Sequence, residues 1–439
     1  RRSLILTLTL TLALRVHPNP NPNPNPGATL SSSMSSSSSA TTLALAAGGG
    51  ALIGGVVTWL ISRRNRLTNV CPATAWPAGK PVLSDPEAYP LYDLSRPPKE
   101  SFEGICDMLI DELLTELPSM YELPVREVTW MRDMLNYNVK GGKMNRGTMV
   151  VEVGKIMAES RGQTLTNEQL VKLAILGWCV EWLQAWLLML DDVMDDSTTR
   201  RGQPCWYRND HVKKIAINDG VTVEMAMFKV LKRHFSTEPM YLQILDLFLE
   251  TTFQTEMGQL LDTLCMNLTL EDFTVDRWTL IVKYKTAFYS FYLPVALGMT
   301  YMGVTSQSAY DTARDILITM GVYFQAQDDY LDCFATEAVL GKRGTDIWDK
   351  KCGWLFAHAY HHLTTKEQRK TLADNYGQGP DLEKEAVVKG IYRDLGLEGF
   401  YEKYEADTKV QLEADIAQVT ELPQGIFHMF LKKIFKRQK

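Results

Sequence analysis

The chain has 439 residues, of which 45% are hydrophobic and 22% are charged. This composition supports a sizeable buried core and excludes a wholly disordered chain. The formal net charge of −6 argues against a general nucleic-acid-binding protein, so we expect no nucleic-acid partner. The seven cysteines are widely spaced without a CxxC pair, which favours buried thiols in a reducing compartment over a disulfide framework or a zinc ribbon.

The N-terminal 84 residues differ from the rest because they contain seven Lys or Arg and no acidic residue. Residues 1–33 include the low-complexity repeat PNPNPNPNP and precede Met34, a candidate start of translation. Residues 34–66 combine a Ser-rich stretch with an uncharged run over residues 41–62, and residues 67–88 resemble a proline-containing linker.

The uncharged run over residues 41–62 predicts a membrane anchor. As a helix it would extend about 33 Å, enough for a hydrocarbon core of about 30 Å. Arg63 and Arg64 follow it, so the positive-inside rule places residues 89–439 in the cytosol, with the endoplasmic reticulum as the expected membrane. The alternative is a cleaved presequence for a mitochondrion or plastid, because such segments are also Ser-rich, Arg-containing and free of acidic residues.

Residues 89–439 are predicted to form one all-α catalytic domain of about ten or more helices, because apolar residues recur with a spacing near 3.6. Residues 170–196 are apolar nearly all round for five turns, which predicts a helix in the centre of the core. Prolines such as Pro118 and Pro294 are expected at the edges of helical segments.

The motif DDxxD occurs twice. The first triplet is Asp191, Asp192 and Asp195, and the second triplet is Asp328, Asp329 and Asp332. On a helix the first and last carboxylates of each triplet share a face, and the middle one lies about 100° round. A solvated acidic face is the alternative, but both triplets follow long apolar runs. Carboxylate oxygens without nearby His or Cys suit Mg²⁺, which usually completes its coordination with substrate phosphates.

Basic residues in the same segments are candidate diphosphate ligands. They are Lys143, Arg146, Arg200, Arg201, Lys285, Lys342 and Lys351. Each alone is typical of a surface charge. Beside two acidic triplets, we interpret them together as cations that hold phosphate oxygens, Arg through its planar fork and Lys as a point charge.

These motifs resemble the eukaryotic-style farnesyl diphosphate synthases of the trans-isoprenyl diphosphate synthase family. The resemblance runs from about residue 89 to the C-terminus and includes GGKMNRG, EWLQAWLLMLDDVMDDSTTRRGQPCWYR, FQTEMGQLLD, IVKYKTAFYSFYLP, FQAQDDYLD and GKRGTDI. It implies an isoprenoid synthase-type helical bundle around a central cavity, a homodimer, and about three Mg²⁺ ions per site with Mn²⁺ as a substitute.

The resemblance also implies the reaction. The two triplets would hold Mg²⁺ on the diphosphate of dimethylallyl or geranyl diphosphate, assisted by Arg200, Lys285 and Lys342. The allylic cation left by ionisation would be attacked by isopentenyl diphosphate to give farnesyl diphosphate. Isopentenyl diphosphate would be held by residues of the basic and polar motifs, namely Lys143, Arg146, Gln184 and Arg201.

Further roles are implied around the cation. Thr286, Gln325 and the Lys285 carbonyl would place neutral oxygens near it, and Tyr289 would lie in the pocket. Thr286 can equally be a core hydroxyl bonded to the preceding turn.

Product length should depend on the residues five and four positions before Asp191, which are Trp186 and Leu187. Both are commonly aromatic in farnesyl-producing relatives, so Leu187 leaves geranyl and geranylgeranyl products open. Two different functions also stay open: an irregular, branched coupling of prenyl diphosphates, and a non-catalytic regulatory subunit. A regulatory subunit would be expected to lose a triplet or its basic partners, whereas this chain keeps both.

Overall fold

The computed structural model describes residues 84–336 and 343–435. The first part contains α2 (Pro98–Tyr121), α3 (Val125–Val139), α4 (Asn145–Ser160), α5 (Asn167–Met194), α6 (Ile215–Phe235), α7 (Tyr241–Leu264), α8 (Val275–Val282), the π-helical segment η5 (Lys283–Tyr292), α9 (Leu293–Tyr301) and α10 (Gln307–Phe334). The second part contains α12 (Trp354–His358), the π-helical segment η6 (Ala359–Leu363), α13 (Lys366–Asn375), α14 (Leu382–Asp394), α15 (Leu397–Ala417) and α16 (Gly425–Ile434). The predicted all-α class with about ten or more helices is confirmed.

Short elements connect these helices. Four 3-10 turns are η1 (Pro86–Ala88), η2 (Trp206–Arg208), η3 (Cys265–Asn267) and η4 (Leu270–Asp272). Among the described residues the only strands are β1 (Thr199–Arg200) and β2 (Gln203–Pro204), which pair antiparallel with Thr199 opposite Pro204. This hairpin directly follows the first triplet and carries two of the predicted phosphate ligands.

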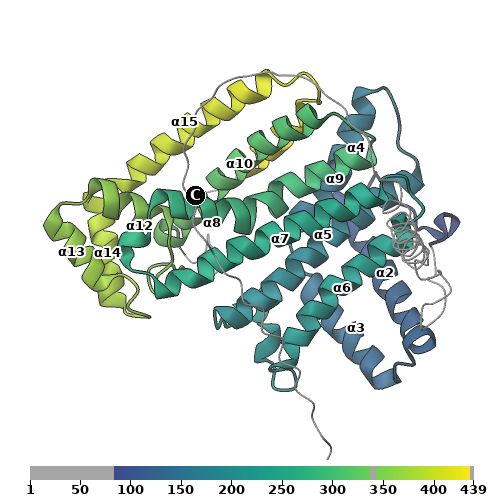
Figure 1. Cartoon of the computed structure of the whole chain (residues 1–439), viewed down its shortest axis with the longest axis horizontal. Helices are drawn as coiled ribbons and strands as arrows, with labels where there is room; N and C mark the ends of the chain where they lie inside the picture. Colours follow the sequence, from purple (N-terminus) through teal and green to yellow (C-terminus); the bar gives the residue numbers. More distant parts are fainter. Residues whose placement is uncertain (1–83, 337–342, 436–439) are drawn as a thin grey trace, which may run out of the picture. The chain divides into compact units, whose positions relative to one another are not determined.

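Helix α5 occupies the centre of the larger core, as its sequence predicts. A capping box between Thr166 and Gln169 begins it, and residues 170–183 are buried almost without interruption. It packs against α2, α3, α4, α6 and α9 (Figure 1). Among the described residues it is the one helix long and apolar enough to cross a membrane, but 78% of its apolar window is buried against other parts of the protein. That burial is typical of a core helix.

Helix α8, segment η5 and helix α9 form a continuous helical run over residues 275–301. The wider π-helical turns end where Leu293 donates its N–H to the Phe288 carbonyl, one residue before Pro294. Since proline has no N–H to donate, a local change of helical pitch accommodates it. Pro294 thus marks an element boundary, as expected, without interrupting the helical chain.

One expectation about proline was wrong. Pro118 lies inside α2, three residues before its last residue, Tyr121. This position is in the final turn of α2. The missing N–H of Pro118 therefore costs one intrahelical hydrogen bond near the helix end.

Glycines allow two close backbone approaches that position the site. A Cβ on Gly258 of α7 would lie 2.0 Å from the backbone nitrogen of Lys285, so only glycine lets α7 and η5 meet there. A Cβ on Gly344 would lie 1.9 Å from the carbonyl oxygen of Asp332, so the loop after residue 342 can lie directly on the end of α10. Substitution at either position would force the two segments apart.

The predicted anchor or targeting segment at residues 34–66 lies outside the described residues, as do the predicted boundaries of the segments before residue 84. Membrane attachment and the compartment therefore remain predictions.

Candidate functional site

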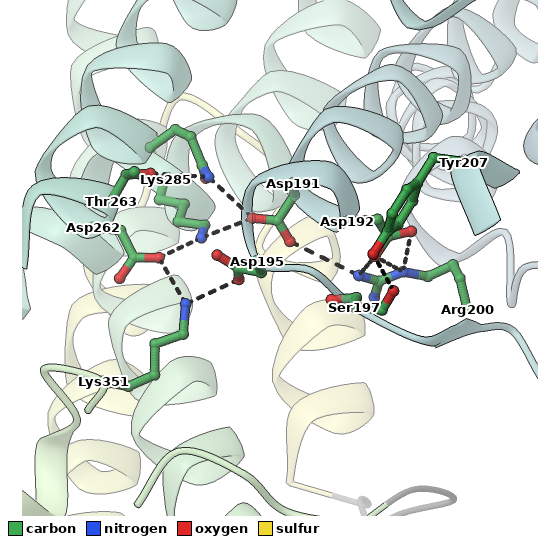
Figure 2. Close-up of polar contacts among 11 residues, drawn as sticks. Asp191, Asp192, Asp195, Ser197, Arg200, Tyr207, Asp262, Thr263, Lys285 and Lys351 are labelled. Carbon is green, nitrogen blue, oxygen red and sulfur yellow. Dashed lines mark hydrogen bonds and ion pairs between the residues drawn. The ribbon is translucent and has the colours of Figure 1, made fainter. Parts of the chain in front are cut away.

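The first triplet divides between two environments, as its spacing on a helix requires. Asp195 and the Oδ1 atom of Asp191 face Lys351 and Lys285, whereas Asp192 faces Arg200 (Figure 2). The Arg200 guanidinium also lies 3.8 Å from Asp191 Oδ2. Asp192 is 4% exposed and accepts a hydrogen bond from Arg200 Nε at 3.1 Å. The two outer carboxylates are therefore placed for a ligand, and the middle one holds the β1–β2 hairpin against α5.

Two lysines connect the outer carboxylates of the first triplet to a third carboxylate on α7. Lys285 Nζ lies 3.2 Å from Asp191 Oδ1 and 2.6 Å from Asp262 Oδ2. Lys351 Nζ lies 3.0 Å from Asp195 Oδ2 and 3.4 Å from Asp262 Oδ2 (Figure 2). The five side chains form one alternating network of charges, which we call the lysine–carboxylate network.

The electrostatics of this network favour charged groups. Burial alone would raise the pKa of Asp262, but Lys285 and Lys351 outweigh it and lower that pKa. Burial likewise works against the charge on Lys285, yet Asp262 and Asp191 raise the Lys285 pKa. The Lys351 pKa is raised for the same reason by Asp262 and Asp195, again against burial. Both lysines therefore stay protonated, and their ammonium groups can form ion pairs with an anionic ligand.

Asp262 is a residue that sequence reasoning missed. It ends the motif FQTEMGQLLD, which carries part of the resemblance but suggested no role for its aspartate. Gln259 of the same motif donates to Asp191 Oδ1 at 3.0 Å. The available signal was the spacing of Gly258, Gln259 and Asp262 on one apolar helix: glycine admits η5, and the two polar residues then face the first triplet.

The second triplet lies at the end of α10 and is more constrained than the first. Asp329 is 8% exposed and accepts from Trp278 Nε1 at 2.8 Å, the Trp354 backbone N–H at 2.8 Å and Gln325 Nε2 at 3.0 Å. Burial raises the pKa of this carboxyl well above its ordinary value, and those donors only partly oppose the effect. Asp329 therefore fixes α8, α10 and α12 around the site.

Asp332 and Asp328 are the outer carboxylates of the second triplet. Asp332 accepts from the backbone N–H groups of Thr345 at 3.3 Å and Asp346 at 3.1 Å, which the close approach of Gly344 makes possible. Asp328 is half-buried on the same helix. The loop from residue 343 onward is thus anchored to α10 by the triplet itself.

A cavity of about 150 Å³ lies between these elements. Lys285 and Thr286 of η5, Gln325 of α10 and Lys351 line it, together with Asp262, Asp329 and Asp346. Gln325 uses its amide nitrogen on Asp329, which leaves the amide carbonyl oxygen for the cavity. The structure thus brings together the predicted residues Lys285, Thr286, Gln325 and Lys351.

A second group of predicted ligands gathers on the α4 side of α5. Arg146 Nε donates to Ser290 Oγ at 2.8 Å, and its guanidinium lies 5.0 Å from the centre of the Tyr289 ring. Tyr289 is 8% exposed, so it supports Arg146 from the buried face of η5. This contact is of the cation–π kind.

Arg201 and Gln184 carry polar atoms that are buried without a hydrogen-bond partner among the described residues, one guanidinium nitrogen and the amide oxygen Oε1. Arg201 uses its other terminal nitrogen to donate to the carbonyl oxygens of Asn138 at 2.8 Å and Lys140 at 2.6 Å. Burial lowers the pKa of Arg201 against the attraction of Glu181. Buried polar atoms without partners are costly, so their pairing with a ligand is favoured.

Glu181 supplies a carboxyl group near the two basic side chains Arg146 and Arg201. It is 2% exposed and accepts the Gly147 backbone N–H at 2.8 Å. Burial raises the pKa of Glu181 above its ordinary value, and the Gly147 N–H, Arg146 and Arg201 only partly oppose this shift. Glu181 lies one helical turn before Gln184, so α5 presents both side chains toward the arginines.

Of the remaining predicted ligands, Lys143 is exposed just before α4, and Lys342 lies outside the described residues. Arg200 is paired with Asp192. Burial would lower the Arg200 pKa, but the Asp192 carboxylate outweighs burial and raises it. Arg201 has a φ of 53°, in the left-handed region, at the tip of the β1–β2 hairpin. The hairpin therefore directs the two consecutive arginines to different groups.

The predicted chain-length residues lie deeper along α5. Trp186 is 5% exposed, and a Cβ on Gly220 of α6 would lie 3.5 Å from its Cδ1 atom. Its indole nitrogen is buried without a hydrogen-bond partner among the described residues. Leu187 is half-buried against the same core cluster. Trp186 is thus a bulky side chain wedged between α5 and α6, one turn and more below the first triplet.

By chemical type, the carboxylate oxygens of the two triplets suit a hard divalent cation. Carboxylate oxygens from α5 and α10 are present, whereas no group of three or more His, Cys, Asp or Glu side chains within the described ranges is arranged to hold a metal ion. The lysines lie among the carboxylates instead. Carboxylates that bind Mg²⁺ weakly by themselves and share it with a phosphate are typical of magnesium sites. In this arrangement Lys285 and Lys351 occupy the outer carboxylates of the first triplet, so a metal ion there would compete with both ammonium groups.

Comparisons with known proteins agree with this geometry. Residues 128–395 match the Polyprenyl synthetase family. The chain is 46% identical to the farnesyl pyrophosphate synthase of Saccharomyces cerevisiae over 347 residues, which cover 78% of this chain and 98% of that protein. It is 44% identical to the farnesyl diphosphate synthase of Dictyostelium discoideum, covering 76% of this chain and 89% of that one.

Solved structures agree as well. A T. brucei farnesyl diphosphate synthase in complex with risedronate has a TM-score of 0.70 and 32% identity, covering 78% of this chain and all of that chain. The resemblance seen in the motifs is confirmed over most of the catalytic domain. The chain belongs to the polyprenyl synthetase family.

Proposed function

We propose that this chain is a Mg²⁺-dependent prenyltransferase that joins isopentenyl diphosphate head-to-tail to dimethylallyl and then geranyl diphosphate, giving farnesyl diphosphate. The observation that carries the proposal is the lysine–carboxylate network. Three of its members, Asp262, Lys285 and Lys351, line the cavity whose walls also include Thr286 and Gln325. The curated relatives named above are farnesyl pyrophosphate synthases, which supports the same reaction.

The diphosphate of the allylic substrate would bind at this network. Asp191 and Asp195 from α5 and Asp328 and Asp332 from α10 would hold the Mg²⁺ ions, for which Mn²⁺ can substitute. Bound there, the ions supply Lewis-acid neutralisation of the diphosphate charge. Lys285 and Lys351 already carry positive charge beside the carboxylates, and with Arg200 they would donate to phosphate oxygens as the substrate enters.

Cleavage of the allylic C1–O bond then releases diphosphate and leaves an allylic cation. Thr286 and Gln325 offer neutral oxygens on the cavity wall, which stabilise positive charge without forming a covalent bond to it as a carboxylate would. The terminal alkene carbon of isopentenyl diphosphate forms the new C–C bond with C1. This attack leaves the positive charge on C3 of isopentenyl diphosphate. A proton then leaves C2, with the departed diphosphate as the base, and the C2=C3 double bond forms.

Isopentenyl diphosphate would be held by the arginine side of α5. The unpartnered guanidinium nitrogen of Arg201 would gain an acceptor when a diphosphate fills the space beside it, whereas the amide oxygen of Gln184 would need a donor such as a bound water molecule. Arg146 lies on α4, and Lys143 lies on the loop just before it. Glu181 keeps the buried arginines in place when no diphosphate is bound.

Product length would be limited where Trp186 fills the space between α5 and α6. A tail growing from C1 would run beside α5 from Asp191 toward this indole, about 1.5 Å for each residue passed. The single aromatic block at this depth favours the farnesyl product, and Leu187 beside it offers less bulk than a ring.

We also propose that the chain is a homodimer. On α7 the apolar side chains of Leu249, Phe253, Met257, Leu260 and Leu264 are all exposed, and Phe253 reaches 61%. Their spacing places them on one helical face. A second copy of the chain would cover this face. Light scattering should give twice the mass of one chain, and Phe253→Asp should shift the protein toward one chain; an unchanged dimer would contradict this surface.

The direct test of the reaction is to incubate the full chain with dimethylallyl diphosphate, isopentenyl diphosphate and Mg²⁺ and to identify the products by mass spectrometry. Farnesyl diphosphate as the main product is expected. If geranyl or geranylgeranyl diphosphate were the only product, the residue that limits product length would not be placed where we propose. A branched product would show irregular coupling in place of head-to-tail condensation. A folded protein that forms no product would favour the regulatory-subunit alternative.

A further inference from the structure

Two buried thiols belong to neighbouring segments beside the cavity, and the reaction described above uses neither; only one of them, Cys352, lines the cavity itself. Cys265 begins the 3-10 turn that ends α7, and Cys352 lies between Lys351 and the start of α12. Cys265 is 3% exposed and Cys352 is 6% exposed, and both belong to the apolar cluster beneath α12 to α15. Both are free thiols.

Contacts on either side hold the two cysteine segments together. Lys351 Nζ lies 3.4 Å from Asp262 Oδ2, and Lys350 Nζ donates to the carbonyl oxygen of Leu268 at 2.8 Å. Asp262 and Leu268 lie three residues before and three residues after Cys265. The segment of residues 350–352 is therefore fastened to the end of α7 at points that flank the cysteines.

These flanking contacts bring the two cysteine segments together, and the two thiols influence each other's ionisation. The interaction with the Cys352 thiol lowers the pKa of Cys265 to about 7. The Cys265 thiol also donates a hydrogen bond to the Leu261 carbonyl oxygen, at an Sγ–O distance of 3.2 Å. A disulfide needs the sulfurs to approach to about 2.05 Å. Neither residue lies within a long helix, so forming that bond would require side-chain rotation and a shift of the 350–353 segment toward the end of α7.

The cavity supplies access to the pair. Cys352 lines it together with Gly353 and Lys285, although little of either cysteine reaches the outer surface. A small neutral oxidant that enters the empty cavity therefore meets Cys352 directly. A bound prenyl diphosphate would occupy the same space and exclude it.

We propose that Cys265 and Cys352 form a redox-modification site, an intramolecular disulfide that links the end of α7 to the segment before α12 and suppresses prenyl transfer. With hydrogen peroxide as the oxidant, one sulfur attacks a peroxide oxygen, the O–O bond breaks, and a sulfenic acid and one water form. The second sulfur then attacks the first and displaces hydroxide, which leaves as a second water. In total the thiols lose two protons and two electrons, and a dithiol reductant reverses the change.

The disulfide acts on the reaction through Lys351. This residue directly precedes Cys352 and lies between Asp195 and Asp262. Pulling Cys352 toward α7 displaces the Lys351 ammonium from the position where diphosphate would meet it. A misplacement of about 1 Å typically costs about 100-fold in rate, which sets the expected loss of activity.

The test treats the full chain with hydrogen peroxide, blocks the remaining thiols by alkylation, and maps the peptides by mass spectrometry before and after reduction with dithiothreitol. A peptide pair joined through Cys265 and Cys352, lighter by two hydrogen atoms than the separate thiol peptides, is expected. Activity should fall about 100-fold and return on reduction. The activity measurement rests on the proposed function, whereas the peptide measurement does not.

Matched variants separate this pair from other thiols. Cys265→Ser, which does not line the cavity, should keep its activity after peroxide treatment. Cys333→Ala, a buried position in the same apolar cluster, should still lose activity reversibly. Absence of the joined peptides in the unsubstituted chain, or equal loss of activity in Cys265→Ser, would overturn the proposal. The peptide result decides the matter if Cys265→Ser does not fold.

Discussion

Replacing Asp262 with alanine removes the carboxylate that two lysines share. The side chain of Asp262 is 11% exposed, and those of Lys285 and Lys351 are 24% and 29% exposed. Removing one partner of a buried ion pair costs about 3–5 kcal/mol. Each lysine keeps a second carboxylate, Asp191 at 3.2 Å and Asp195 at 3.0 Å, so we expect the lower end, about 3 kcal/mol.

This loss is large enough to measure in two ways. An unfolding entropy of about 2.1 cal/mol/K per residue gives about 0.7 kcal/mol/K for a domain of about 350 residues, so the midpoint of thermal unfolding should fall by about 4 °C. Because both ammonium groups lose their fixed position, the initial rate of prenyl transfer should also fall about 100-fold. Thermal unfolding and initial-rate assays on the purified variant provide both values.

The control is Asp246→Ala on the same helix, where the carboxylate is exposed. Exposed substitutions usually stay within about 0.5 kcal/mol, so its midpoint should change by less than about 1 °C and its rate should remain normal. If Asp262→Ala matched this control in both stability and rate, the lysine–carboxylate network would have no organising role and the reasoning would be refuted.

Three further predictions follow from the same contacts. Asp191→Ala should lower turnover by at least about 100-fold with unchanged helical circular dichroism, whereas Asp196→Ala should not; near-normal turnover would remove Asp191 from the metal site. Trp186→Ala should lengthen the product detected by mass spectrometry, and an unchanged product would place the floor elsewhere. Because the folded-state pKa of Asp262 is lowered, its contribution to stability is present above the unfolded value of about 3.9 and is lost as pH falls through the folded value. The difference in unfolding midpoint between the unsubstituted chain and Asp262→Asn should therefore shrink below about pH 4, and a constant difference would contradict the ion-pair assignment.

Features that depend on local spacing could be predicted from the sequence. The apolar run that became α5 has no polar face, so it had to be buried on all sides. The division of the first triplet also follows from helical geometry alone, because Asp192 lies about 100° from Asp191 and meets Arg200 instead of Lys285.

Features that depend on contacts between distant segments could not be predicted in this way. Asp262 joins Lys285 and Lys351 only because α7 and η5 approach at Gly258, and no local pattern reports that approach. The π-helical geometry of η5 is set by packing and by Pro294, whereas its residues also suit an ordinary α-helix.

The burial of Asp329 shows the same limit. Helical spacing places Asp329 off the face that Asp328 and Asp332 share, but it does not say what Asp329 meets there. In the structure Asp329 receives hydrogen bonds from Trp278 and the backbone of Trp354, residues that lie far from it in the sequence. Whether it contacts a metal ion remains a prediction, but its part in joining α8, α10 and α12 follows from these bonds.

The most direct test of the central claim is a crystal structure of the full chain with Mg²⁺ and a non-hydrolysable allylic diphosphate analogue. The proposed function predicts metal ions between the first and second triplets, with the ammonium groups of Lys285 and Lys351 moved from the carboxylates onto phosphate oxygens. Triplets that point apart with no metal between them, and lysines still paired as in Figure 2, would contradict it.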